Sequence, residues 1–118
     1  TGASTAGSIA VTAEGNSTTT NLQQGLAKAW AMASTSASVN DSLNVSGGTD
    51  NGTGDYSYAV SNSMNSTSYT VVGNCGQDDI GIQGNKARAT GSYRVRHNNA
   101  SGSAVDVDNN TNVHGDLA

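Results

Sequence analysis

The sequence predicts an all-β protein built as a single antiparallel β-sandwich or jelly-roll-like domain. Ser, Thr, Asn and Gly account for 58 of the 118 residues, whereas Leu, Ile, Val and Phe together number 17. A chain with so few large apolar residues would be disordered if it were strongly charged. Its net charge is only −4, however, and its apolar residues alternate with small polar ones, which favours thin β-structure.

Short runs with period-two alternation or β-branched residues occur along the whole chain. Clusters of Gly, Asn, Asp and Ser separate them at hairpin-like intervals, and because Pro is absent the turns depend on these residues to reach positive φ. Eight or nine such runs are typical of a sandwich. The predicted strands are residues 8–12, 27–33, 42–46, 56–61, 68–73, 80–83, 88–97, 104–107 and 112–117.

Helix signals are weak. Residues 21–25 predict one helical turn, capped by Thr20 or Asn21 and ended by Gly25. No repeat or linker divides the chain, so we expect one domain over residues 1–118. Within it, residues 1–17 are expected to form a peripheral strand or a connection to a longer parent chain. The first residue is Thr rather than Met, which indicates a processed product or a piece of a longer protein.

Residues 27–33 (AKAWAMA) predict a strand with two unlike faces. Lys28, Trp30 and Met32 share one face, and four alanines form a flat second face that suits close approach by another sheet or subunit. We expect Trp30, the only Trp, to be the main anchor of a thin core. So little core material would leave a monomer marginally stable, which favours a homo-oligomer. A small Val/Ala sandwich that folds alone stays open as the alternative.

Residues 50–55 predict a turn, because they include several types suited to positive φ just before a strand. Asp50, Asn51, Thr53 and Asp55 also offer oxygen ligands to calcium, but residue 61 is Ser, where an EF-hand needs a bidentate Glu. Turn chemistry is therefore the favoured interpretation, and no metal or cofactor is predicted. The same two interpretations apply to two further acidic pairs, Asp78-Asp79 and Asp106/Asp108.

The motifs of common enzyme classes are missing. Glu14 is the only Glu, so paired carboxylates for glycoside hydrolysis would have to come from scattered Asp residues. There is no GxSxG, HExxH or phosphate-binding glycine loop. Cys75 is the only Cys, lies in a loop-like sequence (GNCGQDD), and is far in sequence from His97 and His114. We therefore expect no catalytic residue and no enzyme activity.

The charge pattern argues against two partner classes. Nine acidic against five basic residues do not suit nucleic-acid binding, which needs a clustered basic surface. Arg94 and Arg96 share one strand face with Lys86 and Arg88 nearby, a pattern more typical of a solvated strand face. No apolar stretch approaches the roughly 20 residues of a membrane span, and no signal-peptide pattern occurs. We expect neither nucleic acid nor membrane as a partner.

The chain contains, in this order, NLQQGLAKAW, DSLNVSGGTDNGTGDYSYAVSNSM, SYTVVG and YRVRHNNASGSAVDVDNNTNVHGDLA. These segments resemble a domain that recurs near the C-termini of tailed-bacteriophage virion proteins, especially tail-fibre-like and other appendage proteins. The resemblance runs from about Thr18 to Ala118, and GLAKAW and TDNGTGDY are its specific elements.

The resemblance implies a structural or adhesive module of the virion, homotrimeric as phage fibres generally are, that ends at or near the C-terminus of its chain. It implies other virion proteins as partners, and it carries over no catalytic residue. Related sequences usually place further aromatic residues where this chain has Ala33 or its neighbour, Leu43 and His114. The core is therefore expected to be smaller, which again favours burial between subunits.

Three functions remain open at this stage. The first is a fibre or tail-appendage module that contacts the host surface, where the tyrosines not used in the core would stack on host glycans. Tyr56 and Tyr58 share one strand face, and one of the two faces must be core, which argues against this contact. The second is a capsid decoration or head-fibre protein. The third is a carbohydrate-binding module or a depolymerase fragment, which would need clustered carboxylates around a groove.

Overall fold

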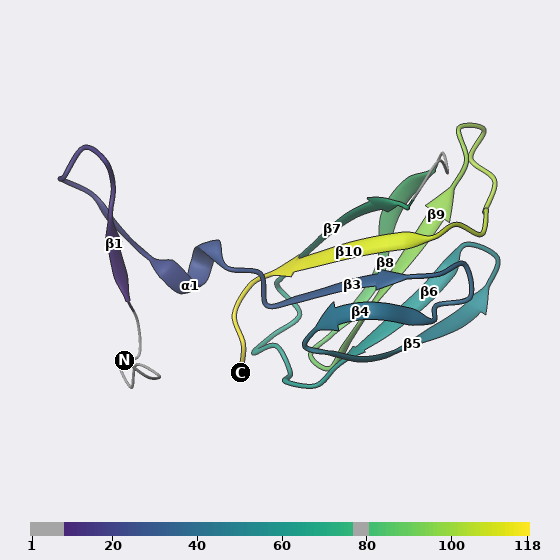
Figure 1. Cartoon of the computed structure of the whole chain (residues 1–118), viewed down its shortest axis with the longest axis horizontal. Helices are drawn as coiled ribbons and strands as arrows, with labels where there is room; N and C mark the ends of the chain where they lie inside the picture. Colours follow the sequence, from purple (N-terminus) through teal and green to yellow (C-terminus); the bar gives the residue numbers. More distant parts are fainter. Residues whose placement is uncertain (1–8, 77–80) are drawn as a thin grey trace.

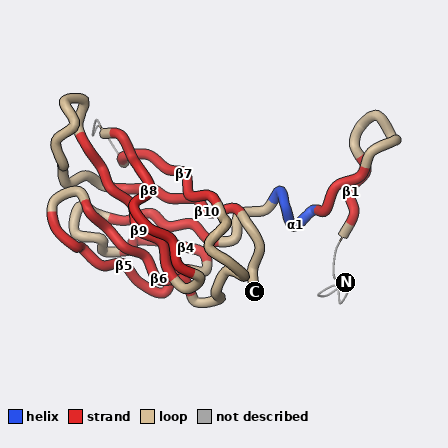
Figure 2. Tube along the Cα trace, turned by 180° about the vertical axis from the view of Figure 1, so that it is seen from behind, coloured by secondary structure: helices blue, strands red, loops and turns tan. Residues whose placement is uncertain are grey.

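The computed structural model describes residues 9–76 and 81–118 and shows a nearly all-β chain (Figure 1, Figure 2). Two four-stranded antiparallel sheets pack against each other through one shared core, and a two-stranded hairpin lies outside them. The predicted all-β class and antiparallel sandwich are therefore confirmed. The hairpin and the short helix that follows it form an arm, residues 9–26, which extends along the long axis of the molecule.

The described elements divide among the arm and the two sheets. The arm contains β1 (Ala10–Thr12), β2 (Thr19–Asn21) and α1 (Leu22–Gly25). The first sheet, in the order β4-β3-β10-β7, consists of β4 (Val39–Leu43), β3 (Ala29–Ala33), β10 (Asn109–His114) and β7 (Thr70–Cys75). The second sheet, in the order β5-β6-β9-β8, consists of β5 (Val45–Gly52), β6 (Asp55–Val60), β9 (Ser92–Asn98) and β8 (Ile82–Ala89).

The core combines small side chains of one sheet with large rings of the other. The inward residues of β3 are alanines, exposed by 3% or less. Tyr56 and Tyr58 of β6 and Tyr93 of β9 are exposed by 2% or less and belong to the same cluster. The interior is thus thin but filled, because the rings occupy the space that the alanines leave.

Three of the four buried tyrosine hydroxyls form hydrogen bonds across the sandwich. Tyr58 of the second sheet donates to Asn109 of β10, and the Tyr93 hydroxyl lies 2.7 Å from the Thr111 Oγ1 of the same strand. Tyr69, just before β7, places its hydroxyl 2.8 Å from the carbonyl oxygens of Ala89 and Ser92. A buried hydroxyl without a partner is costly, so these bonds fix how the two sheets sit on each other.

Trp30 does not anchor the core, and that prediction is wrong. Alternation along β3 places the alanines inward, so Trp30 and Met32 point outward, where Trp30 is half-buried and Met32 is 48% exposed. The physical reason is volume, because the tyrosines of the facing sheet already fill the space over β3.

The predicted strand over residues 42–46 is wrong, because it spans the corner between β4 and β5. The corner residue is Asn44, with φ +57°, and its Nδ2 donates to the carbonyl oxygen of Lys28 at 3.0 Å. Residues 50–52, expected to belong to the turn, instead complete β5, and the chain reverses only at residues 52–54.

Other boundaries also shift. The predicted strand 88–97 contains the hairpin turn between β8 and β9, and residues 104–107 form only an isolated bridge at Ala104. Cys75 ends β7 rather than lying in a loop. The predicted helical turn is confirmed as α1, whose Asn21 Oδ1 accepts the backbone N–H of Gln23 at 3.0 Å. Residue 8 and residue 80, each at the start of a predicted strand, lie outside the described residues.

The cross-sheet hydroxyl bonds lead to a test. Replacing Tyr93 with Phe should lower the free energy of unfolding by about 1 to 3 kcal/mol, because Thr111, 3% exposed, loses its partner. Adding Thr111→Val should recover most of that loss, since both partners are then apolar. Urea denaturation measures the effect, and losses that simply add in the double variant would contradict the assigned bond.

Candidate functional site

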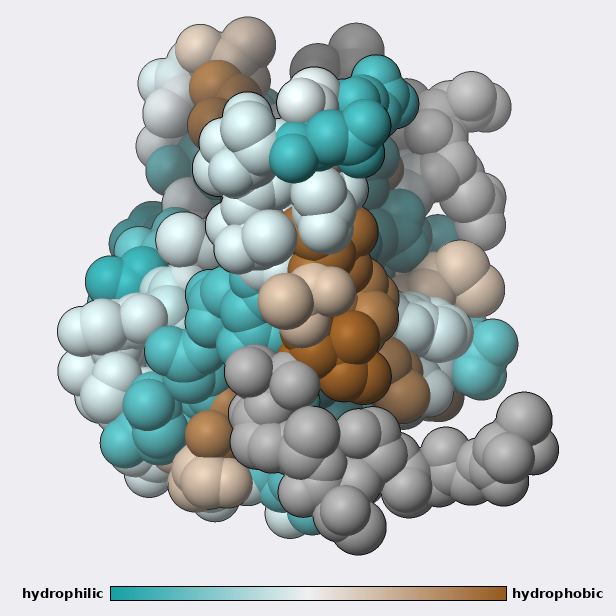
Figure 3. All heavy atoms as spheres, turned by 90° about the vertical axis from the view of Figure 1, so that its left-hand side faces the viewer, coloured by the Kyte–Doolittle hydropathy of each residue, from teal (hydrophilic) through white to brown (hydrophobic). Residues whose placement is uncertain are grey.

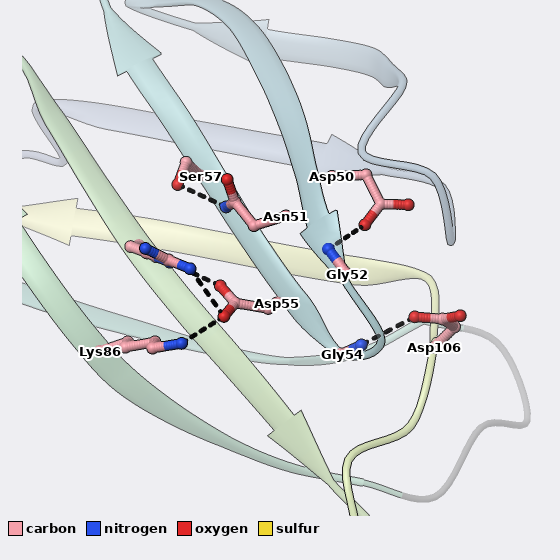
Figure 4. A network of polar contacts seen from close by, with 9 residues as sticks. Asp50, Asn51, Gly52, Gly54, Asp55, Ser57, Lys86 and Asp106 are labelled. Carbon is pink, nitrogen blue, oxygen red and sulfur yellow. Dashed lines mark hydrogen bonds and ion pairs between the residues drawn. The ribbon is translucent and has the colours of Figure 1, made fainter.

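The acidic turn between β5 and β6 is held by side-chain oxygens (Figure 4). Gly52 and Gly54 have φ values of +125° and +66°, which glycine adopts without strain. The Asp50 Oδ1 accepts the Gly52 N–H at 2.9 Å, and the Asp106 Oδ1 accepts the Gly54 N–H at 2.7 Å. Asp106 comes from the segment before β10, so this bond ties the turn to a part of the chain distant in sequence.

Next to the turn, Asp55 is the centre of an ion-pair network (Figure 4). Asp55 is 8% exposed, and its carboxylate accepts Arg94 Nε at 2.6 Å and Nη2 at 2.9 Å and also pairs with Lys86. The network therefore links β6, β9 and β8. The hydrogen bond from Arg94 is the largest reason why the pKa of Asp55 falls to about 2.

The oxygen-bearing residues of the turn do not converge on a cation. Asp50 accepts from Gly52, Asp55 faces two cations, and the Asn51 amide donates to Ser57 Oγ at 2.7 Å. Calcium requires several anionic oxygens around one point. Within residues 9–76 and 81–118, no group of three or more His, Cys, Asp or Glu is placed to hold a metal ion. The turn interpretation therefore fits the geometry.

Of the remaining acidic candidates, Asp106 and Asp108 contact different parts of the chain. Asp106 is used in the turn, and its Oδ1 also lies 3.2 Å from the Tyr56 hydroxyl. The Asp108 carbonyl oxygen accepts the Gly76 N–H at 2.6 Å. The pair Asp78-Asp79 lies outside the described residues.

His97 is not available as a general base. It is fully buried, its Nε2 lies 3.0 Å from the Gln83 Oε1, and burial lowers its pKa. Cys75 is partly buried at the end of β7, and His114 ends β10 opposite Thr70. A base with no exposed surface cannot act on an external substrate, so His97 does not form a nucleophilic pair that faces solvent.

The shared strand face of Tyr56 and Tyr58 is the core face, because both side chains are fully buried and cannot stack on a sugar. Tyr69 and Tyr93 are also core residues. The core needs these rings because it lacks Phe and has few large aliphatic residues. Trp30 is thus the only aromatic residue of the chain outside the core cluster.

Four of the five cationic residues lie on β8 and β9 (Lys86, Arg88, Arg94 and Arg96). The strand register places Arg94 and Arg96 on the outer side of the sheet and Arg88 on the inner side, opposite Tyr93. A groove of about 250 Å³ is lined by Arg94 together with Ser57 and Ser92. Asp55 is the only acidic group paired with any of them within the described parts of the chain, so this basic surface keeps an excess of positive charge. The bulge between Asn85 and Ala87 re-aims Lys86 toward Asp55.

The arm carries an apolar face that the sequence reasoning missed. Leu22 donates its N–H to the Ile9 carbonyl at 2.8 Å and Val11 pairs with Thr20, so Ile9, Val11 and Leu22 share one side of the hairpin. These three side chains are 44%, 41% and 39% exposed. Apolar surface faces the viewer on this end of the molecule (Figure 3). The sequence predicted a strand over residues 8–12, but residues 19–22 (TTNL) show no alternation that would have indicated its partner strand.

A second apolar surface covers the outer side of the first sheet. The strand register places Leu43, Trp30, Asn112 and Val72 in one row across β4, β3, β10 and β7. Leu43 and Val72 are 47% and 58% exposed, and Met32 lies in the next row. We call this set, Trp30, Met32, Leu43 and Val72, the outer apolar row.

Comparisons with protein-family models, with curated proteins and with solved structures found no significant match. In the described part of the chain, no helix is both long and apolar enough to cross a membrane.

The Asp55 network predicts a pH dependence. The folded-state pKa lies below the ordinary value of 3.8, so the network stabilises the fold above about pH 4, and this contribution is lost as the pH falls toward 2. It should amount to about 1 to 2 kcal/mol, because the partly exposed Arg94 and Lys86 are screened by water. Unfolding curves measured from pH 5 to pH 2 should show this loss of stability in the native chain but not in the Asp55→Asn variant. An equal loss of stability in both proteins would refute the prediction.

The turn predicts a strict need for glycine at position 54. Gly54→Ala should cost at least about 2 kcal/mol, because its φ of +66° strains an L-residue and the new Cβ would lie 2.5 Å from the His97 carbonyl oxygen. Gly84→Ala is the matched control, since nothing lies within 4 Å of its Cβ position. Thermal unfolding compares them, and equal midpoints would contradict the assigned turn.

Proposed function

We propose that the chain is a structural module of a bacteriophage virion, a homotrimeric part of a tail fibre or similar appendage that contacts the host surface. The segments that resemble phage appendage proteins support this role. The thin sandwich rich in hydroxyl and amide groups suits a structural part, and the role requires no catalytic residue.

The observation that carries the proposal is the exposure of every leucine in the chain. Leu22, Leu26, Leu43 and Leu117 are 39%, 51%, 47% and 42% exposed. The chain has only 17 residues of Leu, Ile and Val, so it leaves a large share of its best core material at the surface. Leu22 belongs to the apolar face of the arm and Leu43 to the outer apolar row, and apolar side chains grouped in this way suit contact with other chains. Self-association would bury them.

The oligomeric state can be measured directly. Sedimentation equilibrium should give about three times the chain mass of 11.8 kDa at micromolar concentration. A folded monomer that persists across a wide concentration range would refute the self-association.

The place in the virion needs a separate experiment. An antibody against this domain, applied to intact particles of the phage that encodes it, should mark fibres or tail appendages by electron microscopy. Labelling of the shell would favour the capsid decoration or head-fibre alternative, and absence from particles would overturn the virion role.

The basic surface supports a second candidate function, attachment to an acidic host glycan. Carboxylate and phosphate groups are recognised by arginine forks, and the groove lined by Arg94, Ser57 and Ser92 lies on the same sheet face as Arg96. With the tyrosines buried, this surface is a more suitable contact for a glycan than an aromatic stacking face.

The glycan contact predicts a charge-dependent affinity. Arg96→Gln should weaken binding to an acidic polysaccharide about tenfold, because it removes an arginine on the outer face of this sheet that has no acidic partner in the described chain. Lys28→Gln, which removes a cation elsewhere, should leave binding unchanged. Calorimetry with uronate-bearing, phosphate-bearing and neutral polysaccharides identifies the anion, and equal binding to all three would contradict an electrostatic contact.

A further inference from the structure

The arm and the outer apolar row are two uncovered apolar surfaces of one chain. The hairpin face of the arm consists of Ile9, Val11 and Leu22, each about two-fifths exposed. An isolated two-stranded hairpin is at best marginally stable in water, so this arm requires a surface to pack on. The outer apolar row has the same chemistry and no covering element within the described chain.

The base of the arm keeps it from folding back onto its own sheet. Lys28 Nζ donates to the carbonyl oxygens of Gln23 and Leu26, the latter at 2.7 Å. Gln24 Nε2 donates to the Asp116 Oδ1 at 2.6 Å, which ties α1 to the C-terminal segment. These bonds direct the arm away from the sandwich along the long axis (Figure 1). Its apolar face therefore meets another molecule more readily than its own sheet.

We propose that the arm of one copy packs its Ile9, Val11 and Leu22 face on the outer apolar row of a second copy. This inference rests on the proposed self-association and names the two surfaces that form it. The sizes agree, because four strands span about 14 Å across a sheet and residues 9–12 span about 13 Å along a strand. The exchange covers both surfaces of each chain, and when repeated around an axis it closes a ring.

The exchange also accounts for Trp30. A half-buried Trp beside exposed aliphatic side chains and the amide of Asn112 suits the centre of a protein interface. A hollow of about 550 Å³ lies at the base of the arm and is lined partly by Leu26 and Leu117. It offers room for side chains of the neighbouring copy.

Cross-linking tests the pairing of the two surfaces. In a Cys75→Ser background, copies with Val11→Cys and copies with Val72→Cys are refolded together and oxidised. A disulfide should form between the two kinds of copy. Thr12→Cys, the next residue on the opposite side of the hairpin, should give far less product with Val72→Cys. Cross-links mainly between two Val11→Cys copies would show that arms pack on arms, and would overturn the exchange.

A charge on the arm gives an independent measure. Val11→Asp should raise the dissociation constant of the oligomer about tenfold or more, since it places a charge in the apolar contact, whereas Thr12→Asp should leave it nearly unchanged. Both residues lie outside the core, so the unfolding of the sandwich serves as a folding control. An oligomer insensitive to Val11→Asp would overturn the exchange and leave self-association standing. A monomeric native chain would overturn both.

Discussion

The tyrosine hydroxyl bonds between the two sheets are the contacts on which this sandwich depends. A chain without Phe and with few aliphatic residues fills its interior with tyrosine rings, and each ring brings a polar atom inside. Because a buried hydroxyl must find a partner, the relative position of the sheets is restricted to the one that pairs Tyr58 with Asn109 and Tyr93 with Thr111. Hydrogen bonding thus supplies the specificity that shape complementarity among large apolar side chains gives in other cores.

The small number of large apolar side chains also explains which features could be predicted from the sequence. Period-two alternation was sufficient for the all-β class and for strands such as β3 and β6, because alternation depends only on which face is buried. It could not decide which face of β3 points inward, since that depends on the volume supplied by the other sheet. Trp30 was therefore placed wrongly, and the corner at Asn44 was missed because its positive φ depends on side-chain bonds to distant carbonyl groups.

In the candidate sites too, some features could be predicted from the sequence and others could not. The turn character of residues 50–55 follows from Gly and Asp in the sequence, but the pairing of Asp55 with Arg94 and Lys86 requires the alignment of three strands. The apolar face of the arm depends on pairing between β1 and β2, which no local pattern revealed. Features within one strand were accessible to sequence reasoning, and features shared between strands were not.

The location of the aromatic residues separates two optical signals. The single Trp lies on an outer sheet face, whereas all four tyrosines lie in the core. Tryptophan fluorescence in this protein therefore reports the surroundings of the first sheet's exterior, and near-ultraviolet tyrosine signals report the packing of the interior. Association and unfolding of one chain can be followed independently without any attached label.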